Sequence, residues 1–339
     1  MSVLKIGLIG DIVGRAGRNM VVDNLSEIRK KYKLDFVIAN AENASGGFGL
    51  NIKNANELLS AGIDLITGGN HSFDKMEITA VMGRDLESSV DSVCKNGLDS
   101  SVEFVESKVK SSTDSAKIAE SSPKSQDSSP DSPTFQMFNL SQNLTKSSFI
   151  MPILRPLNFP PKTPGSGICC INLGGEKIAV INIMGHYGIN MNLDNAFYKL
   201  QNAVSAVKKL GFDNIIIDFH GEASSEKRAA FCMLRGEISA FFGTHTHIGS
   251  DDLHIQNGSF YVSDLGLCGA FDGVIGMDYK APLQKAMSGF GKSRYEVANS
   301  NNNILQMVIL TLENAKCVEA FKLRILNNKE LDIINAIRL

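Results

Sequence analysis

The stretch VLKIGLIGDIVGR, residues 3–15, decides how this chain begins to fold. Its first part, Val3–Ile9, is an apolar run with the length of a buried strand, and it stops at Gly10 and Asp11. The mixture of apolar and polar residues from Arg15 to Lys31 predicts a helix. The chain is therefore predicted to open with a strand, a loop and a helix.

The same unit recurs along the sequence. Further strands are predicted at Phe36–Ala39, Leu65–Ile66, Asn214–Phe219 and Ile238–Phe242, and further helices at Asn54–Ser60, Leu193–Leu210 and Ser224–Leu234. Two apolar segments that flank Gly174-Gly175 predict a hairpin, Gly167–Leu173 with Lys177–Ile183, and Ile304–Leu312 with Val318–Ile325 predict a final pair of strands. Strands that alternate with helices indicate an α/β fold.

One segment has a different composition. Residues 85–147 are crowded with serine, lysine and acidic residues, so they cannot bury enough apolar surface to offset the entropy lost on ordering. We expect an inserted, mostly disordered segment with a short helix near Leu98–Val109. A passive insertion is favoured over a regulatory role because surface loops tolerate long insertions. Residues 1–84 and 148–339 are then predicted to form a single domain.

Composition limits the classes of partner and compartment. The 34 Lys and Arg residues against 36 Asp and Glu residues give a net charge of -2, without the basic excess of proteins that bind duplex nucleic acid. A long nucleic acid is therefore an unfavoured partner, although a local basic groove stays open. The apolar start is too short for a signal peptide or a membrane span, and the six cysteines form no CxxC pair. We expect a cytoplasmic protein without a membrane partner.

Side chains that bind metals follow the predicted strands. They are Asp11, Glu42, Asn43, Asn70, His71, His220, His245 and His247. Because α/β proteins gather their sites from loops at the carboxyl ends of strands, we expect these residues to converge. Each alone has an ordinary interpretation, as a helix cap, a turn residue or a hydrogen-bonded histidine, and we keep the last interpretation for His186 and His254. Together they predict a site for two cations.

The residue types also favour particular metals. Imidazole suits iron, manganese, zinc or nickel, whereas carboxylate and amide oxygens suit harder ions. The mixed set argues against calcium and magnesium, and manganese or iron fits best. Two cations need a bridging carboxylate, for which Glu42 is the candidate, and His245 and His247 are spaced to reach two different metals.

The motif blocks resemble those of the calcineurin-like metallophosphoesterases. The blocks that carry this resemblance are Gly10-Asp11, Gly69-Asn70-His71 and Gly243-Thr244-His245-Thr246-His247. A bacterial branch, the YmdB-type phosphodiesterases, is similar over almost the whole chain outside the serine-rich segment. Its blocks include Gly10-Asp11-Ile12-Val13-Gly14-Arg15, Glu42-Asn43-Ala44, Leu154-Arg155-Pro156, Asp218-Phe219-His220, Ser225-Glu226-Lys227 and Val274-Ile275-Gly276-Met277.

This resemblance implies a fold, an activity and a set of ligands. The fold would be a β-sandwich core flanked by helices, in four αββα layers, and the activity hydrolysis of small phosphodiesters, notably 2′,3′-cyclic nucleotides, at an iron or manganese pair. Asp11, Asn43 and His247 would hold the first metal, Asn70, His220 and His245 the second, and Glu42 would bridge them. The wider superfamily has Asp-x-His in its first block. Here Val13 replaces that histidine, so Asn43 would complete the first set.

The implied mechanism gives His71 a role of its own. A metal-bridging hydroxide would attack the phosphorus, and His71 would protonate the leaving alkoxide, a role that suits histidine as a residue type because imidazole ionises near working pH. The alternative is that His71 only hydrogen-bonds Asp74. His186 and the stretch 266–270 depart from the branch pattern in predicted loops near the site, which affects the expected substrate contacts.

Three interpretations of function stay open at this point. A small-molecule phosphodiesterase is favoured. A phosphomonoesterase or nucleotidase would use the same metals, and a regulator would bind a cyclic nucleotide with slow turnover or none. A homo-oligomer is compatible with all three.

Overall fold

The computed structural model describes residues 3–82, 136–138, 150–291 and 293–339. Most of the segment predicted as an insertion, including the helix expected at Leu98–Val109, lies outside these residues. Within that segment Gln136–Phe138 form a short strand, β5, which pairs with the strand that begins at Ile168. The sequence had suggested disorder there, because three residues are too few to give a strand pattern.

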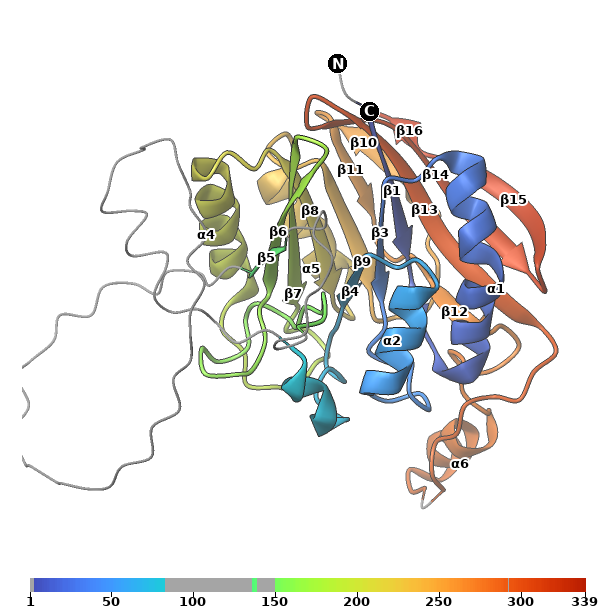
Figure 1. The fold of residues 1–339 in the computed structure, drawn as a ribbon. Helices are drawn as coiled ribbons and strands as arrows, with labels where there is room; N and C mark the ends of the chain where they lie inside the picture. The colour runs from blue at the N-terminus through green and yellow to red at the C-terminus, as the bar shows by residue number, and fades with distance from the viewer. Residues whose placement is uncertain (1–2, 83–135, 139–149, 292) are drawn as a thin grey trace, which may run out of the picture.

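Two eight-stranded sheets form the centre of the molecule (Figure 1). The first contains β1 (Val3–Ile9), β2 (Asp11–Ile12), β3 (Phe36–Asn40), β4 (Leu65–Thr67), β12 (Leu267–Ala270), β13 (Asn303–Glu313), β14 (Lys316–Leu326) and β15 (Lys329–Asn335). The second contains β5, β6 (Ile168–Leu173), β7 (Glu176–Met184), β8 (Asn214–His220), β9 (Ala240–Thr244), β10 (His254–Gln256), β11 (Ser259–Val262) and β16 (Ile337–Arg338).

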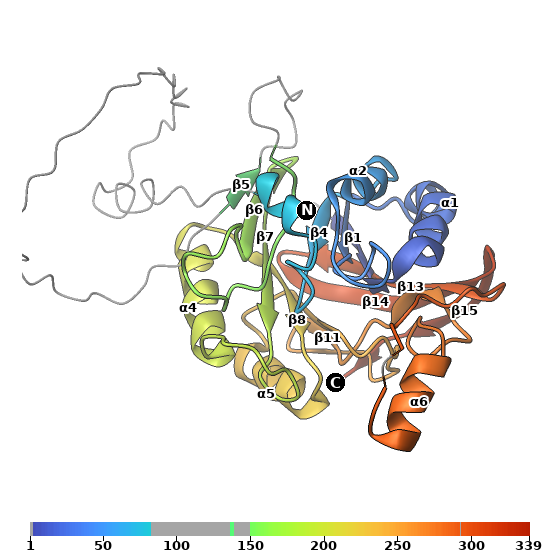
Figure 2. The ribbon, with the colours of Figure 1, turned by 90° about the horizontal axis from the view of Figure 1, so that it is seen from below.

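Helices cover the outer faces of both sheets. Helices α1 (Gly14–Tyr32) and α2 (Ile52–Ser60) lie on the first sheet, and α4 (Ala196–Lys209) and α5 (Ser224–Leu234) lie on the second. Figure 2 shows the two helix pairs on opposite sides of the sheets. A 3-10 helix, η1 (Met76–Ala80), follows β4, and α6 (Lys280–Ser288) projects from the body of the molecule (Figure 1).

Three apolar clusters fill the spaces between these layers. One lies between the sheets and includes Ile6 and Phe36 from the first sheet with Ile216 and Phe242 from the second. A second joins α1 and α2 to the first sheet, and a third joins α4 and α5 to the second sheet. The predicted four-layer αββα architecture is therefore confirmed.

Parallel pairing brings the carboxyl ends of neighbouring strands together. In the first sheet β1, β3 and β4 are parallel neighbours, and in the second β7, β8 and β9 are. The register aligns Asn40 with Thr67 and His220 with Thr244, so the loops that leave these strands start at matching levels. This edge of the sandwich holds the residues expected to bind metal.

Several elements differ from the sequence-based expectation. The predicted pair near the C-terminus forms the antiparallel strands β13 and β14, and the predicted hairpin forms β6 and β7. Strands β10, β11, β12 and β15 and helix α6 were not predicted. The stretch 266–270, expected as a loop, largely forms β12, and Cys268 within it is fully buried. Among the described residues, no helix is both long enough and apolar enough to span a bilayer.

The packing between the sheets gives a stability prediction. Phe242 is 1% exposed in the cluster between the sheets. We expect Phe242→Ala to lower the free energy of unfolding by about 3–5 kcal/mol, because the lost ring leaves a cavity. Phe271 is 55% exposed, so Phe271→Ala should change that free energy by less than about 0.5 kcal/mol. Urea denaturation of both variants tests this, and equal losses would contradict it.

Candidate metal centre

The eight candidate residues come from five strands whose ends meet at one edge of the sandwich. Asp11 lies in β2, Glu42 and Asn43 follow β3, Asn70 and His71 follow β4, His220 ends β8, and His245 and His247 follow β9. Both sheets therefore contribute. The structure brings these residues into one network of contacts.

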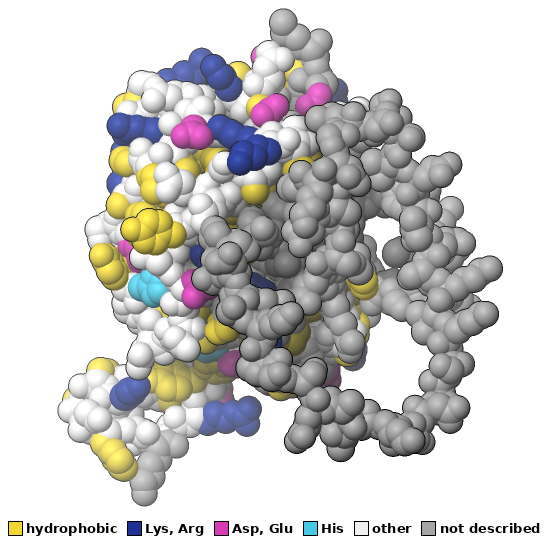
Figure 3. Space-filling view, turned by 90° about the vertical axis from the view of Figure 1, so that its left-hand side faces the viewer, with side chains coloured by type: hydrophobic (Ala, Val, Ile, Leu, Met, Phe, Trp, Pro, Cys, Tyr) yellow, Lys and Arg dark blue, Asp and Glu magenta, His cyan; other side chains and the backbone are white. Residues whose placement is uncertain are grey.

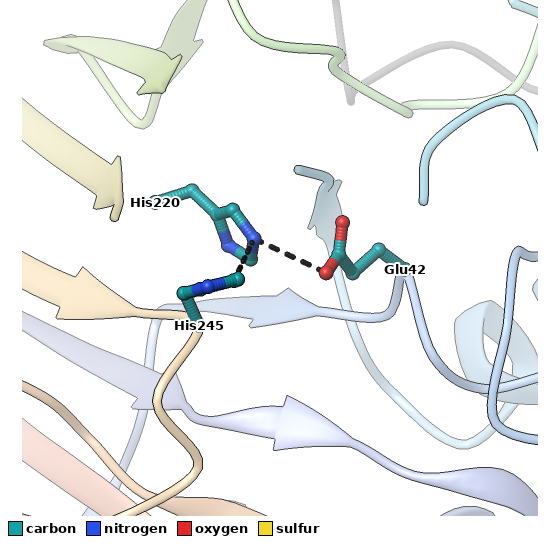
Figure 4. Close-up of side chains that lie close together, drawn as sticks. All are labelled: Glu42, His220 and His245. Carbon is teal, nitrogen blue, oxygen red and sulfur yellow. Dashed lines mark hydrogen bonds and ion pairs between the residues drawn. The ribbon is translucent and has the colours of Figure 1, made fainter. Parts of the chain in front are cut away.

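The first group of contacts centres on His220 (Figure 4). Its Nε2 lies 3.1 Å from Glu42 Oε1, 3.1 Å from His245 Nδ1 and 2.9 Å from Asn70 Oδ1. The nearest ligand atoms of Glu42, His220 and His245 all lie within 4.8 Å of one another. Four atoms that can each donate a lone pair thus face one small volume, an arrangement that suits a cation.

A second group of contacts, formed by Asn43, His247 and Asp11, also reaches Glu42. The Asn43 amide nitrogen, Nδ2, is 3.3 Å from Glu42 Oε1 and 3.2 Å from His247 Nε2. His247 Nε2 is in turn 3.7 Å from Asp11 Oδ1. Glu42 Oε1 therefore contacts both groups, and the two groups share this one carboxylate.

Asp11 tests whether the second group fits a cation. Its side chain is fully buried, and its Oδ1 atom has no hydrogen-bond partner among the described residues. Its Oδ2 atom accepts a hydrogen bond from the backbone N–H of His245 at 3.1 Å. A buried carboxylate oxygen without a partner is costly, and coordination of a cation removes that cost. The residues present therefore fit a metal ion.

The pKa values follow from burial and from the pairing of Glu42 with His220. Burial raises the pKa of Asp11 to about 6. Burial also opposes ionisation of Glu42, but the adjacent His220 outweighs it and lowers the pKa of Glu42 to about 2. In the same way burial is outweighed for His220, whose pKa is raised to about 9 by Glu42. Burial, together with His220, lowers the pKa of His245 to about 3, which leaves that imidazole neutral and able to act as a ligand.

The backbone at the end of β9 is strained. His245 and His247 have φ values of 99° and 64°, in the left-handed region that residues with a Cβ rarely adopt. His247 Nδ1 donates a hydrogen bond to the carbonyl of Ile275 at 2.8 Å, which leaves its Nε2 facing Asp11 and Asn43. Strained conformations of this kind concentrate at functional sites.

His71 lies at the border of the site. Its backbone N–H donates to Glu42 Oε2 at 2.8 Å, its ring packs edge-on against Phe48, and its Nδ1 lies 2.8 Å from Asp74 Oδ2. The contact with Asp74 that the sequence suggested is therefore present. His186 and His254 lie outside the network, and each makes a hydrogen bond to a backbone carbonyl, those of Asp194 and Asp252.

The sequence did not identify a set of buried residues behind His220. Asp218 accepts hydrogen bonds from the hydroxyls of Thr67 at 2.5 Å and Thr244 at 2.7 Å. Since a hydroxyl has one proton to donate, Thr244 Oγ1 must accept from His220 Nδ1, which lies 3.0 Å away. When the imidazole is neutral, as it must be to bind a metal, this contact keeps the proton on Nδ1 and leaves the lone pair of Nε2 directed at the site. Strand alternation, which places Asp218 on the same face as His220, was a signal that could have indicated this contact.

Comparisons with known proteins identify the family of this chain. The family model for YmdB-like proteins matches residues 8–87 and 134–323. The chain belongs to the YmdB-like family. The resemblance predicted from the motif blocks is therefore confirmed.

Three relatives illustrate the membership. A 2′,3′-cyclic-nucleotide 2′-phosphodiesterase of Bacillus subtilis is 31% identical over 308 residues, 90% of each chain. The crystal structure of a novel phosphatase from Mycoplasma pneumoniae is 26% identical with a TM-score of 0.72, covering 98% of this chain and 95% of the other. That of a hypothetical protein from Thermus thermophilus is also 26% identical, with a TM-score of 0.71 and coverage of 95% and 99%.

Gly69 gives a prediction about the first group. A Cβ atom at this position would lie 2.2 Å from His220 Nε2 and 2.5 Å from Glu42 Oε2. We expect Gly69→Ala to displace both side chains and to reduce the bound manganese, measured by elemental analysis after dialysis, to less than half. Gly291→Ala is the control for loss of a glycine, because its φ is outside the left-handed region and the nearest atom to a Cβ there would be 3.4 Å away. Full metal content in Gly69→Ala would show that the first group holds no metal.

The residues behind His220 give a second prediction. Thr244→Val removes the hydroxyl that links Asp218 to His220, so His220 Nδ1 loses its acceptor. We expect manganese affinity, measured by calorimetric titration, to fall by about 10–100-fold, as is usual when a ligand loses its orienting partner. Thr79→Val removes an exposed hydroxyl away from the site and should leave the affinity unchanged. Unchanged affinity in Thr244→Val would show that Thr244 does not orient His220.

Proposed function

We propose that this chain is a dinuclear-metal phosphodiesterase that hydrolyses small phosphodiesters, with 2′,3′-cyclic nucleotides as the favoured class. One observation carries the proposal: two groups of buried or partly buried polar side chains, drawn from both sheets, share the single carboxylate of Glu42. The activity of the Bacillus subtilis relative supports the substrate class. The substrate is a small molecule, and the expected location is the cytoplasm.

The proposed ligand sets follow the two groups of contacts. Asn70, His220 and His245 would hold one cation and Asp11, Asn43 and His247 the other, with Glu42 between them. Iron or manganese suits this mixture of imidazole, carboxylate and amide ligands. When bound, such a pair supplies Lewis-acid stabilisation of the phosphoryl oxygens and makes water acidic enough to attack at neutral pH.

The protein's own residues would complete the reaction. Asp74 accepts a hydrogen bond from His71 Nδ1 and so fixes the ring, which frees Nε2–H of the protonated imidazole to donate to the leaving alkoxide. The backbone N–H of His71 also donates a hydrogen bond to Glu42, which holds the proposed proton donor next to the proposed bridging carboxylate. The contact of His71 with Asp74 is thus compatible with a role of His71 as proton donor.

A second candidate is a phosphomonoesterase that uses the same residues. The observation in its favour is the similarity to the Mycoplasma pneumoniae protein, which is described as a phosphatase. Substrate preference separates the two. Manganese-loaded protein should hydrolyse 2′,3′-cyclic AMP and bis-p-nitrophenyl phosphate with kcat/KM at least about tenfold above that for p-nitrophenyl phosphate. Equal or faster hydrolysis of the monoester would favour the phosphatase, and tight binding of the cyclic nucleotide without product would favour a regulator.

His71 gives the prediction that tests the proton donor. We expect His71→Ala to retain both metals and to lower kcat for 2′,3′-cyclic AMP by about 10²–10⁴-fold, the usual contribution of a general acid. Bis-p-nitrophenyl phosphate should lose much less, because nitrophenolate leaves without a proton. His254→Gln, which removes a histidine on β10 outside the network, is the control. Equal losses on both substrates would mean that His71 positions the substrate and does not donate a proton.

A further inference from the structure

A basic cleft lies beside the proposed catalytic loops. Its volume is about 660 Å³, within the usual range for small-molecule sites. It lies between the first turns of α1 and α2 and is closed on a third side by residues 297–300 and Asn303. Arg15, Arg18 and Lys75 supply its positive charge. Among the described residues that line the cleft, none is acidic.

The charges in this cleft are largely uncompensated. The charged side-chain groups of Arg15 and Lys75 have no ion-pair or hydrogen-bond partner within the described part of the chain. Arg18 is held in place by Glu57, at 2.7 Å, and by the carbonyl of Ala44. Arg18 is thus balanced by a carboxylate, whereas Arg15 and Lys75 are not, and an anionic ligand would balance these two charges. The side-chain amides of Asn19, Asn51 and Asn299 add further polar groups to the walls.

Two loops connect the cleft to the candidate metal centre. Ser45 and Gly46 line the cleft and follow Asn43 by two and three residues, so Ser45 lies within about 7 Å of Asn43 along the chain. Lys75 lines the cleft and directly follows Asp74, the partner of His71. The two loops touch at Gly49, where a Cβ would lie 2.9 Å from Lys75 N and 3.1 Å from Asp74 Cβ. Neighbouring residues of the same two loops therefore border the cleft and the candidate metal centre.

We propose that this cleft binds a second phosphate of the substrate, carried on the 5′ oxygen of the nucleoside whose 2′,3′-cyclic phosphate is hydrolysed. The proposal rests on the proposed function, since it takes the metal centre as the place where the cyclic phosphate binds. Arginine provides paired N–H donors for phosphate oxygens, and lysine adds a point charge. Two sources share this chemistry: a mononucleotide with a 5′-phosphate, and an oligonucleotide that ends in a cyclic phosphate. A short oligonucleotide needs only a local basic cleft, which is compatible with a net charge of -2.

The test compares three substrates of the manganese-loaded full chain. They are adenosine 2′,3′-cyclic phosphate, its 5′-phosphorylated form, and the dinucleotide ApA with a 2′,3′-cyclic phosphate end. We expect kcat/KM to be about tenfold higher for one or both phosphorylated substrates, equivalent to about 1.4 kcal/mol of binding to the second phosphate. A preference for the 5′-phosphorylated mononucleotide alone identifies a monoester site, and a preference that includes the dinucleotide identifies an internucleotide site.

Substitutions in the cleft test whether it causes the preference for substrates with a second phosphate. Arg15→Gln should bring the ratio of kcat/KM values down to about one, and Arg15→Lys should retain part of it. Lys316→Gln is the matched control for lost charge, because Lys316 lines a separate pocket among the strand turns near the end of α4. Figure 3 shows Lys and Arg side chains gathered at that end of the molecule, opposite α6. A ratio unchanged by Arg15→Gln, or lowered equally by Lys316→Gln, would overturn the proposal.

A binding measurement separates failure of the cleft from failure of the catalytic proposal. Adenosine 3′,5′-bisphosphate and adenosine 3′-monophosphate differ only in the 5′-phosphate, and calorimetry measures their binding without any turnover. We expect the bisphosphate to bind about tenfold more tightly, with the difference lost in Arg15→Gln and reduced by added salt. Equal affinities would overturn the cleft proposal even if the cyclic substrate is hydrolysed. Absence of hydrolysis with the affinity difference intact would overturn the proposed function and leave the cleft as a phosphate site.

Discussion

The shared carboxylate of Glu42 is the contact on which the rest of the site depends. It is almost fully buried, one oxygen contacts His220 and Asn43, and the other accepts the backbone N–H of His71. A charge in such a position is tolerated only when it is paired and hydrogen-bonded on all sides. The loops after β3, β4 and β8 must therefore stay in place. Parallel pairing holds β3 to β4 in one sheet and β8 to β7 and β9 in the other.

The packed layers hold these loops in place. The apolar cluster between the sheets fixes the distance between β3 and β4 on one side and β8 and β9 on the other. Polar residues concentrate where the cluster ends, and most are satisfied by one another, as Asp218 is by Thr67 and Thr244. The exceptions are informative: Asp11 Oδ1 lacks a hydrogen-bond partner among the described residues, and the backbone of His245 and His247 is strained. Stability is thus lowered locally in the part of the molecule that is proposed to bind metal.

The same loops carry residues of both proposed sites, the metal centre and the basic cleft. The segment Glu42–Asn43 faces the candidate metal centre, while Ser45 and Gly46, a few residues on, face the basic cleft. Similarly, His71 and Asp74 border the metal centre and Lys75 borders the cleft. Short loops that carry different functions on neighbouring residues are expected where binding groups sit on a rigid scaffold. The stretch GDIVGR is divided in the same way, since Asp11 lies in the candidate metal centre and Arg15 lines the cleft.

The sequence by itself determined the order of the elements around the site and the residues that follow each strand. Apolar runs such as Val3–Ile9 and the helix Ser224–Leu234 agree with the structure to the residue, because a buried strand and an amphipathic helix each leave a local periodic pattern. Short or half-exposed elements such as β10 and β15 leave no such pattern and were missed. Only the tertiary structure decided how the ligand residues divide into two groups about Glu42, and how Thr244 joins Asp218 to His220. The tertiary structure alone also decided that Arg15 and Lys75 line one cleft. These contacts join residues that are far apart in the sequence. Strand pairing within a sheet brings Thr244 to Asp218 and His220, and the packing of one sheet against the other brings Glu42 to His220. Sequence spacing sets neither.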